Sequence, residues 1–288
     1  MNHLFCLVSS KVTENYTKVA LDTFFKFTKL EKEDLFIFIN NDSTNSFKNN
    51  YPIDIYINNN TQLNWSQNFN QGLKLAKEKK MHFVVLTNDI MFTKGWFEPL
   101  KQKDDAILVP SCNVNYMYKN NGFNTGITMK LNEILNKEHL IEEIVEFHQR
   151  NNDFYKLEER IFLPLFLARI PFNVYNEVGF FDEKFHLGGE DMDYRFRAAI
   201  KGFKTMLAIH SYVIHFHGKS TWDGQETSEQ ELNRRNNYIK YSLEKWGENF
   251  TEIFIRGINA KEWCEKIGLK KELENNESFN IMRKINIC

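Results

Sequence analysis

The chain has 288 residues, of which 42% are hydrophobic, and a formal net charge of -1 at pH 7. The hydrophobic content allows a sizeable core and argues against a disordered chain. The near-zero net charge argues against a general binder of nucleic acid or of anionic membranes, so we expect no nucleic-acid partner.

Cysteine spacing and the first residues indicate a reducing compartment. Cys6, Cys112, Cys264 and Cys288 lack the paired spacing of zinc or redox motifs, and the chain runs directly into a strand pattern at residues 4–8 rather than into a signal peptide. We therefore expect a cytoplasmic protein with reduced thiols. No apolar run reaches the ~20 residues of a membrane span. The run 161–168, interrupted by Pro164, favours a buried helix or an approach to a strand, and contact with the cytoplasmic face of a membrane stays open.

Strand and helix patterns alternate through the first half. Uniformly apolar runs predict strands over residues 4–8, 35–39, 53–57 and 82–86. Helix patterns between them begin near Thr13 and at Ser66. This alternation predicts a mostly parallel, doubly wound sheet of Rossmann-like type, covered by helices on both faces. Ligands of such sheets bind beyond the carboxyl ends of the strands, where the polar segments 40–45 and 87–89 lie.

The second half is less regular. Further strands are predicted over 106–110, 126–130, 170–175 and 212–214, with mostly helical material over 132–167. A helix is expected from Glu190 to about Lys201, ended by Gly202. Past Trp222 the pattern is helical. We therefore expect an α/β domain over residues 1–223, with halves 1–110 and 111–223, and a helical extension over 224–288.

Three motifs carry candidate chemistry. Asp89 follows the buried strand 82–86, Glu190-Asp191 follows Gly188-Gly189 at a helix start, and His215 ends a strand pattern with His217 two residues later. A carboxylate, a second acid and a histidine are what a metal-assisted group transfer needs. Two glycines allow the backbone to approach a ligand closely.

Each motif also has a purely structural interpretation. Asp89 is a common turn residue that could cap the following helix. Acids in the first turn of a helix are ordinary caps, and the helix dipole lowers their pKa, so a base there needs burial or a neighbouring acid. A histidine near a strand end is often only hydrogen-bonded, and Lys219 could be a solvated lysine.

Together, and in this order, the motifs resemble a family 2 glycosyltransferase of the GT-A fold over roughly residues 4–247. The segments that carry the resemblance are 39–45, 64–66 with 70–72, 86–89 with 95–97, 178–185 continuing through 190–193 to Arg197 and Gly202, 215–220, and 245–247. The match at 178–202 is the strongest, and the ordered set is specific.

The resemblance implies an inverting enzyme of polysaccharide biosynthesis type. It would move a sugar from a nucleoside-diphosphate sugar, with UDP-sugars favoured, to a hydroxyl of a saccharide, lipid-linked or protein acceptor. Residues 1–110 would bind the donor, and 111–223 the acceptor. Asp89 and His215, with His217 as a further candidate, would hold Mn²⁺ or Mg²⁺. Asp191, or less favourably Glu190, would deprotonate the acceptor.

The remaining site residues follow from the same resemblance. The donor would contact Ser9, Ser10, Asn40, Asp42, Asn70, Asn88 and Lys219. The acceptor would lie near Trp96, Gly189 and Trp222.

Two departures from the family pattern bear on the donor site. Asn40 stands where the family usually has Asp, and Thr87-Asn88-Asp89 carries one carboxylate where many relatives have two. A single anionic ligand binds Mg²⁺ or Mn²⁺ more weakly.

Two alternatives were weighed against this interpretation. A sugar-phosphate nucleotidyltransferase is disfavoured because residues 9–13 contain no glycine for a phosphate loop. The second alternative is a catalytically inactive, saccharide-binding GT-A-like domain. Thr87, which stands in place of an acid, keeps this alternative open, whereas retention of Asp89, Asp191 and His215 argues against it.

Overall fold

The computed structural model describes residues 1–41, 47–113, 130–134, 137–186, 188–218 and 226–286. Within these ranges, one nine-stranded sheet runs through the molecule in the order β3-β2-β1-β4-β8-β6-β9-β5, and β7 pairs with β9. The strands are β1 (His3–Ser9), β2 (Leu35–Asn40), β3 (Ile55–Asn58), β4 (His82–Thr87), β5 (Ile90–Met91), β6 (Ala106–Cys112), β7 (Leu157–Glu158), β8 (Leu167–Ile170) and β9 (Lys204–His215).

The long strands share one direction, with one reversal. β3, β2, β1 and β4 are parallel neighbours, and β6 is parallel to β9. β8 lies antiparallel between β4 and β6 and joins these two parallel sets. The carboxyl ends of β1, β2 and β4 therefore meet at one edge, as the apolar strand patterns predicted.

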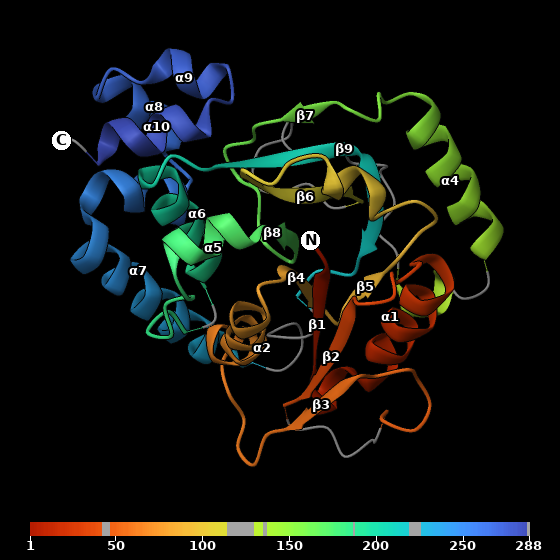
Figure 1. Ribbon diagram of the computed structural model, residues 1–288. Coiled ribbons are helices and arrows are strands. Elements are labelled where there is room, and N and C mark those ends of the chain that lie inside the picture. Colours follow the sequence, from red (N-terminus) through yellow and green to blue (C-terminus); the bar gives the residue numbers. More distant parts are fainter. Residues whose placement is uncertain (42–46, 114–129, 135–136, 187, 219–225, 287–288) are drawn as a thin grey trace.

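Helices cover both faces of the sheet. Figure 1 shows α1 on one face and α2, α5 and α6 on the other. The helical elements are the 3₁₀ turns η1 (Lys11–Thr13) and η2 (Glu98–Lys101), the π-helical η3 (Thr251–Arg256), and the α-helices α1 (Glu14–Phe27), α2 (Trp65–Lys79), α3 (Leu131–Ile134), α4 (Glu138–Arg150), α5 (Phe172–Val178), α6 (Glu190–Ile200), α7 (Ser228–Phe250), α8 (Ala260–Lys266), α9 (Lys270–Glu274) and α10 (Ser278–Ile285).

Close packing determines how near the helices come to the sheet. On the α1 face, the ring of Phe24 lies 5.2 Å from that of Phe5 and 5.3 Å from that of Phe92. On the α2 face, a Cβ at Gly72 would lie 2.6 Å from the Cys6 sulfur. A larger residue at position 72 would therefore push α2 off β1.

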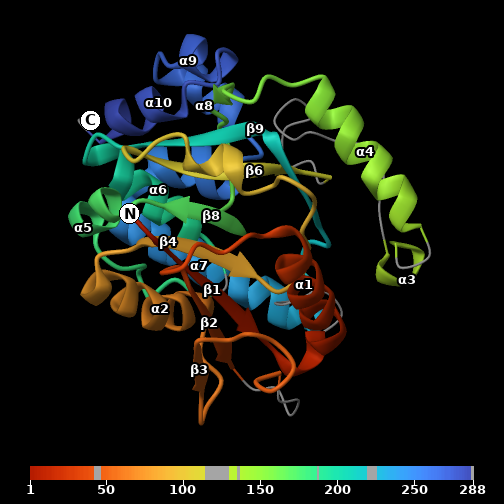
Figure 2. The same ribbon diagram turned by 45° about the vertical axis from the view of Figure 1, so that its right-hand side comes forward.

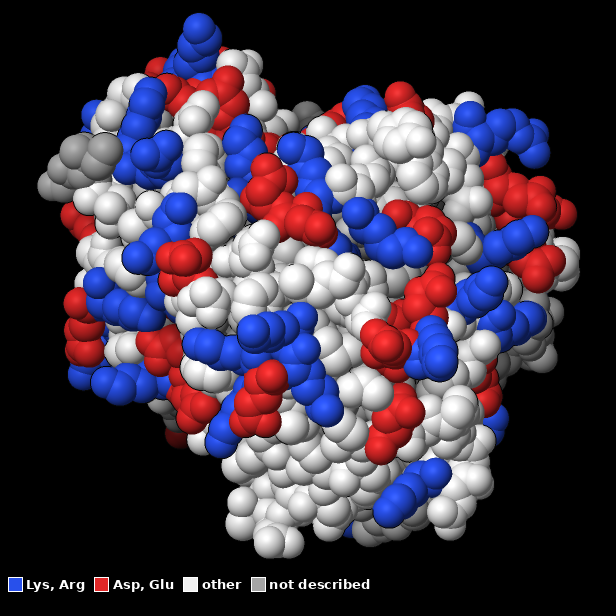
Figure 3. Space-filling view, in the orientation of Figure 1, with Lys and Arg blue, Asp and Glu red and all other residues white. Residues whose placement is uncertain are grey.

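Helices α7 to α10 form a helical tail, in which α7 and α10 pack on α6, α8 packs on η3, and α9 packs on α8 and α10. Phe196 of α6 shares a buried cluster with Phe250, Phe254 and Ile281. Figure 2 shows α8 to α10 close together beside the amino-terminal end of β9. The boundary at residue 223 lies outside the described residues and stays a prediction. No helix among the residues described has both the length and the apolarity to cross a membrane. In Figure 3, side chains of both charges are interspersed over the visible face, in keeping with the small net charge.

Two sequence predictions are wrong. The helix predicted over 132–167 ends at Arg150, and the apolar run 161–168 takes the second of its two expected forms, a buried approach to the short strand β8. The strand predicted over 170–175 is instead β8 followed by α5, because Pro171 precedes the first turn with an extended backbone and the chain turns helical at Phe172. β3 also begins two residues later than predicted. Most of the predicted strand 126–130 lies outside the described residues.

A buried polar cluster fixes the opposite, amino-terminal ends of β1 and β4. Arg169 of β8 donates to His3 Nε2 at 3.1 Å and to Asp104 Oδ1 at 2.5 Å, and His82 Nε2 lies 3.5 Å from the same oxygen. Phe172 N donates to His82 Nδ1 at 3.1 Å. Burial, followed by the charge of Arg169, lowers the pKa of His82 to about 3. His82 is therefore neutral in the folded protein at any pH near neutrality.

The neutral state of His82 predicts acid sensitivity. Below pH 6.5 His82 becomes protonated in the unfolded chain, whereas in the folded chain it stays neutral down to about pH 3. The contribution of His82 to the free energy of unfolding therefore falls as the pH falls through this range. We expect His82→Gln, whose side chain can still accept from Phe172 N, to remove on the order of 2 kcal/mol of the loss between pH 7 and 4.5. Urea denaturation across this range measures it. His139→Gln, on an exposed position of α4, is the control. Equal pH dependence in the wild type and His82→Gln would contradict the assignment.

Candidate functional site

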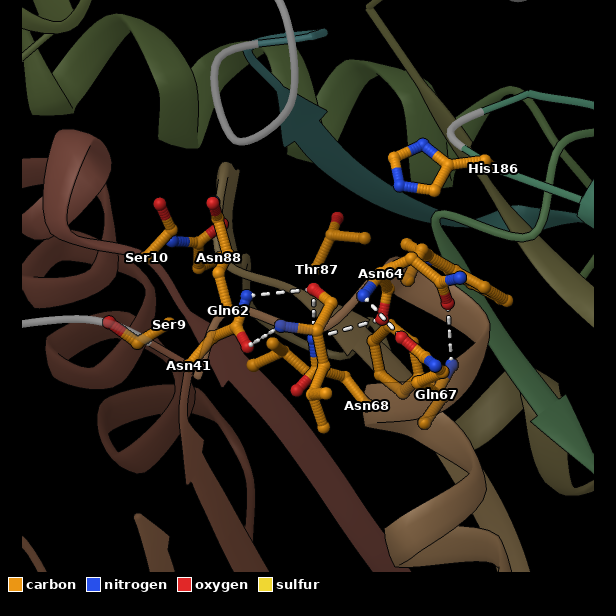
Figure 4. Close-up of a pocket in the computed structure, with 14 residues that line it drawn as sticks. Ser9, Ser10, Asn41, Gln62, Asn64, Gln67, Asn68, Thr87, Asn88 and His186 are labelled. Atoms are coloured by element: carbon orange, nitrogen blue, oxygen red, sulfur yellow. Dashed lines mark hydrogen bonds between the residues drawn. The ribbon is translucent and has the colours of Figure 1, made fainter. Parts of the chain in front are cut away.

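A polar cavity of about 210 Å³ opens at the carboxyl edge of the parallel strands. Its walls come from the ends of β1, β2 and β4 and from the first turn of α2, with His186 on the far side from Ser9 and Ser10 (Figure 4). The lining residues are Val8, Ser9, Ser10, Asn41, Gln62, Leu63, Asn64, Trp65, Gln67, Asn68, Phe69, Thr87, Asn88 and His186. Hydroxyl and amide groups dominate this list, so the cavity suits a ligand rich in hydrogen-bonding groups.

Amide side chains hold the floor of the cavity in place. Asn41 Oδ1 accepts from Leu63 N at 2.8 Å, and Asn41 Nδ2 donates to Leu63 O at 3.0 Å. Asn64 caps α2 by accepting from Gln67 N at 2.8 Å, while Gln67 Oε1 accepts from Asn64 N. These bonds fix the backbone that surrounds the cavity before any ligand arrives. The sequence analysis missed Asn41, Gln62, Asn64 and His186 as cavity residues, although Asn41 stands next to Asn40 in the same polar segment.

Three of the predicted donor residues line the cavity and meet at the start of α1. Asn88 Nδ2 donates to Thr13 Oγ1 at 2.6 Å and to Thr17 Oγ1 at 2.8 Å, and the hydroxyl of Ser9 lies 3.2 Å from that of Thr17. Ser10 precedes η1, with its carbonyl accepting from Thr13 N. Ser9, Ser10 and Asn88 are thus brought together at the carboxyl ends of β1 and β4.

Asp89 and His215 are brought together by pairing between β5 and β9. Ile90 stands opposite His215 in the antiparallel register, and Phe216 N donates to Asp89 O at 2.9 Å. Asp89 Oδ1 then lies 3.4 Å from His215 Nε2. The His215 ring stacks on Phe166 with centroids 4.3 Å apart, and its backbone N–H donates to Asn113 Oδ1 at 2.7 Å. These contacts determine the orientation of the imidazole.

The two side chains stabilise each other's charged forms. Burial alone would raise the pKa of Asp89, but the charge and hydrogen bond of His215 outweigh it and hold the pKa below its usual value. Burial alone would lower the pKa of His215, but the Asp89 carboxylate raises it to about 9. The pair is therefore an ion pair at neutral pH.

A carboxylate beside an imidazole is a partial ligand set for a divalent cation. Mn²⁺ and Mg²⁺ are held in many sites by one or two protein ligands, with substrate phosphates supplying the rest. Among the residues that the structure describes, no group of three or more His, Cys, Asp or Glu side chains could hold a metal. His217, with φ of +55°, lies beyond the strand, and its ring centroid is 5.8 Å from that of His215. Because histidine binds a metal as the neutral imidazole, a cation bound here would displace the proton of His215. With that proton displaced, the donor set fits a cation that also binds ligand oxygens.

Glu190 and Asp191 open α6 in a partly buried turn. Gly188 N donates to Glu190 Oε2 at 2.6 Å, and Met192 N donates to Asp191 Oδ1 at 2.8 Å. Burial, followed by the charge of Asp191, raises the pKa of Glu190 to about 7, and burial raises the pKa of Asp191 as well. The dipole of α6 favours the charged forms, as the sequence analysis expected, but burial outweighs it. Glu190 can therefore accept a proton near neutral pH, and Asp191 holds a proton more readily than an ordinary aspartate.

Asp193, one turn further along α6, is completely buried and is a structural anchor. Its Oδ1 accepts from Lys245 Nζ at 2.6 Å and Trp246 Nε1 at 2.7 Å, and its Oδ2 accepts from Arg197 Nε at 2.9 Å. Lys245 also donates to Asp182 Oδ2 at 2.6 Å. The two sequence motifs 190–193 and 245–247 are therefore in direct contact, and α7 is fixed to the helix that carries Glu190 and Asp191.

Several predicted ligand contacts are corrected. Trp96 is fully buried, and its indole N–H donates to Thr28 Oγ1 at 2.9 Å, so it is a core residue and cannot border an acceptor. Asn70 exchanges hydrogen bonds with both backbone groups of Phe181 and donates to Glu183, so its amide holds the loop before α6. Asn40 donates to Asn58 Oδ1 at 2.7 Å and is not among the residues that line the cavity.

Other predicted contacts stay untested. A Cβ at Gly189 would lie 3.1 Å from the Phe185 ring. The absence of a side chain at Gly189 therefore allows the Phe185 ring, rather than a ligand, to lie close to the backbone. Asp42, Lys219 and Trp222 lie outside the described residues.

Comparison with known proteins identifies the fold. The chain is similar to GalNAc-T7 with UDP, GalNAc and Mn²⁺ (TM-score 0.58, 14% identity, 99% of this chain and 56% of that one). It is also similar to S. aureus TarS (TM-score 0.53, 10% identity, 100% and 55%) and to the mannosyltransferase PcManGT from Pyrobaculum calidifontis in complex with GDP-Man and Mn²⁺ (TM-score 0.50, 8% identity, 99% and 86%). The chain thus has the GT-A fold of these glycosyltransferases and spans about half the length of the first two.

Sequence comparisons add nothing further. No family model matches the chain, and no curated protein matches it.

The anchor role of Asp193 predicts a large stability cost when its partner is removed. Breaking a buried ion pair leaves a charge uncompensated, so we expect Lys245→Met to lower the free energy of unfolding by about 3 kcal/mol. Lys240→Met, on the exposed side of the same helix with 77% of its side chain exposed, should change it by less than about 0.5 kcal/mol. Urea denaturation of both variants measures the difference. Equal losses would show that Asp193 does not anchor α7.

Proposed function

We propose that this protein is an inverting, metal-dependent glycosyltransferase of family 2 type. It transfers a sugar from a nucleoside-diphosphate sugar to a hydroxyl of a saccharide, lipid-linked or protein acceptor. The observation that carries the proposal is the placement of Asp89 and His215. Asp89 directly follows Thr87 and Asn88, which line the polar cavity at the carboxyl edge of the sheet, and its buried carboxylate lies 3.4 Å from His215 Nε2.

The donor nucleotide would occupy the polar cavity. Ser10, Asn41 and Asn64 offer hydroxyl and amide groups there, which match the hydrogen-bonding edges of a base and a ribose. GalNAc-T7 was solved with UDP and PcManGT with GDP-Man, so the fold accommodates either nucleotide. We favour UDP, and dTDP-sugars are a third candidate.

Asp89 and His215 would hold Mn²⁺ or Mg²⁺ beside the donor diphosphate. When bound, the cation would neutralise the charge that develops on the departing nucleoside diphosphate. Two of the similar structures contain Mn²⁺. The pair here supplies one carboxylate and one imidazole, which leaves coordination positions for phosphate oxygens.

Asp191 would take the acceptor proton. The acceptor hydroxyl oxygen forms a bond to the anomeric carbon, the bond from that carbon to the diphosphate oxygen breaks, and the hydroxyl proton passes to the carboxylate. Attack from the face opposite the leaving group inverts the anomeric configuration. Burial raises the pKa of Asp191 and so makes it a stronger base than an exposed aspartate. Glu190 is the second candidate for this role.

Donor binding is tested by thermal shift with UDP, GDP and dTDP, each with and without Mn²⁺. We expect UDP with Mn²⁺ at saturating concentration to raise the melting temperature by about 5 °C. In Asp89→Asn, the portion of this rise that requires Mn²⁺ should be absent. Asp105→Asn, with 76% of its side chain exposed, is the matched acid control. If no nucleoside diphosphate stabilises the protein, the proposal is wrong. Stabilisation without transfer or donor hydrolysis would instead support an inactive, saccharide-binding domain.

Removal of the base separates chemistry from donor binding. We expect Asp191→Asn to reduce transfer at least ~10³-fold, within the range of general-base contributions, while the nucleotide-dependent rise in melting temperature persists. Glu190→Gln should reduce transfer by a smaller factor than Asp191→Asn. Loss of nucleotide stabilisation in Asp191→Asn would place this residue at the donor site, and a larger loss of transfer in Glu190→Gln would assign the base to Glu190.

A further inference from the structure

The aromatic ring of Tyr238, on α7, rests on the turn that leads into α6. A Cβ at Gly188 would lie 2.5 Å from Tyr238 Cδ1 and Cε1. No real side chain fits in that space, so the ring is in direct contact with the Gly188 backbone. Tyr238 is partly buried, and it comes from the helical tail rather than from the sheet domain.

This contact continues to the two acids. Gly188 N donates to Glu190 Oε2 at 2.6 Å, and Asp191 is the next residue. Burial raises the pKa of Tyr238, and the carboxylates of Glu190 and Asp191 raise it further, whereas Arg235 and Arg234 lower it. The phenol therefore lies within the electrostatic field of both candidate bases.

The neighbouring residues on the same face of α7 hold the helix in place. Tyr241, three residues on, donates to Asp182 Oδ2 at 2.8 Å and packs its ring 4.8 Å from that of Phe185. Lys245 follows at helical spacing and bonds to Asp182 and Asp193. These two residues anchor α7 to the loop and helix around the acids, and Tyr238 is thereby pressed onto the Gly188 turn.

We infer that Tyr238 is a positioning residue for the acid pair: its ring fixes the Gly188 turn and excludes water from the carboxyls of Glu190 and Asp191. The role in transfer depends on the proposed function, whereas the packing itself does not. The helical tail would then do more than cover the domain, because it completes the environment of the base.

The groups that face Glu190 determine the pH consequence. Asp191 raises the pKa of Glu190, and Arg234 of α7 lowers it, while burial is the largest influence and brings it to about 7. Arg195 of α6 acts on Asp191 in the lowering direction. Removing the Tyr238 ring admits water and weakens the largest influence, so the pair should titrate at lower pH.

The first test compares Tyr238→Ala, Tyr238→Phe and Leu232→Ala in the full chain by the pH dependence of kcat/KM. We expect the acid limb of the profile to move about one pH unit lower in Tyr238→Ala. It should be unchanged in Tyr238→Phe, which keeps the ring, and in Leu232→Ala, which removes an exposed apolar side chain from the same helix. In Tyr238→Ala, kcat should fall while the donor KM is retained. An unshifted limb in Tyr238→Ala, or an equal shift in Leu232→Ala, would overturn the inference.

The second test needs no activity, so failure of the proposed function can be told apart from failure of this inference. Because the folded protein holds the proton of Glu190 more tightly than the unfolded chain, the contribution of Glu190 to the free energy of unfolding should decline as the pH rises from about 4.5 through 7. The contribution of His82 changes in the opposite direction and is common to both Tyr238 variants. By urea denaturation, the free energy of unfolding at pH 8 relative to pH 5 should therefore be higher in Tyr238→Ala than in Tyr238→Phe. Gly188→Ala should cost less stability in the Tyr238→Ala background than alone. An equal pH dependence in the two Tyr238 variants, with additive costs for Gly188→Ala, would show that the ring does not enclose the acids.

Discussion

The buried carboxylate of Asp193 is the constraint on which the acid turn depends. A fully buried charge is tolerated only when it is paired and hydrogen-bonded, and Asp193 has Lys245, Trp246 and Arg197 as donors. Two of these donors come from α7, so the charge can stay buried only while α7 is docked. Glu190 and Asp191 begin the same helix, and their geometry is therefore coupled to a segment more than fifty residues away in the sequence.

The sheet supplies the second half of the arrangement. β1, β2 and β4 are parallel, so their polar ends converge, and the cavity forms there. The antiparallel β8 separates β4 from β6 and, through Arg169, ties down the amino ends of β1 and β4. Asp89 lies between β4 and the short strand β5, and pairing of β5 with the end of β9 places Asp89 beside His215. The position of the carboxyl edge thus depends on the Arg169 contacts at the amino ends of β1 and β4 and on the pairing of β5 with β9 beyond the carboxyl end of β4.

The sequence predicted the elements whose patterns are unambiguous. β1, β2, β4 and α6 agree closely because their apolar runs or helix signals are continuous. The segment 151–166 is not the predicted helix, because an apolar run without clear periodicity does not distinguish a helix from an irregular buried segment. Residues 172–178 form a helix rather than a strand because Pro171 precedes the first helical turn. The Asp89–His215 pair could be suspected from residue types, but its contact depends on β5–β9 pairing. Nothing local marks Asp193 as the partner of Lys245, since pairing between distant helices leaves no periodic signal.

The acid turn shows how burial competes with the helix dipole. Position at the first turn of α6 stabilises a carboxylate by about 0.3 to 1 kcal/mol at an exposed site. Raising the pKa of Glu190 from 4.5 to about 7 corresponds to roughly 3 kcal/mol in the opposite direction. Burial and the neighbouring charge of Asp191 therefore exceed the dipole several-fold. A helix start that packs against α7 is consequently a place where a carboxylate can hold a proton near neutral pH, although the same residues at a solvated helix start would be ordinary caps.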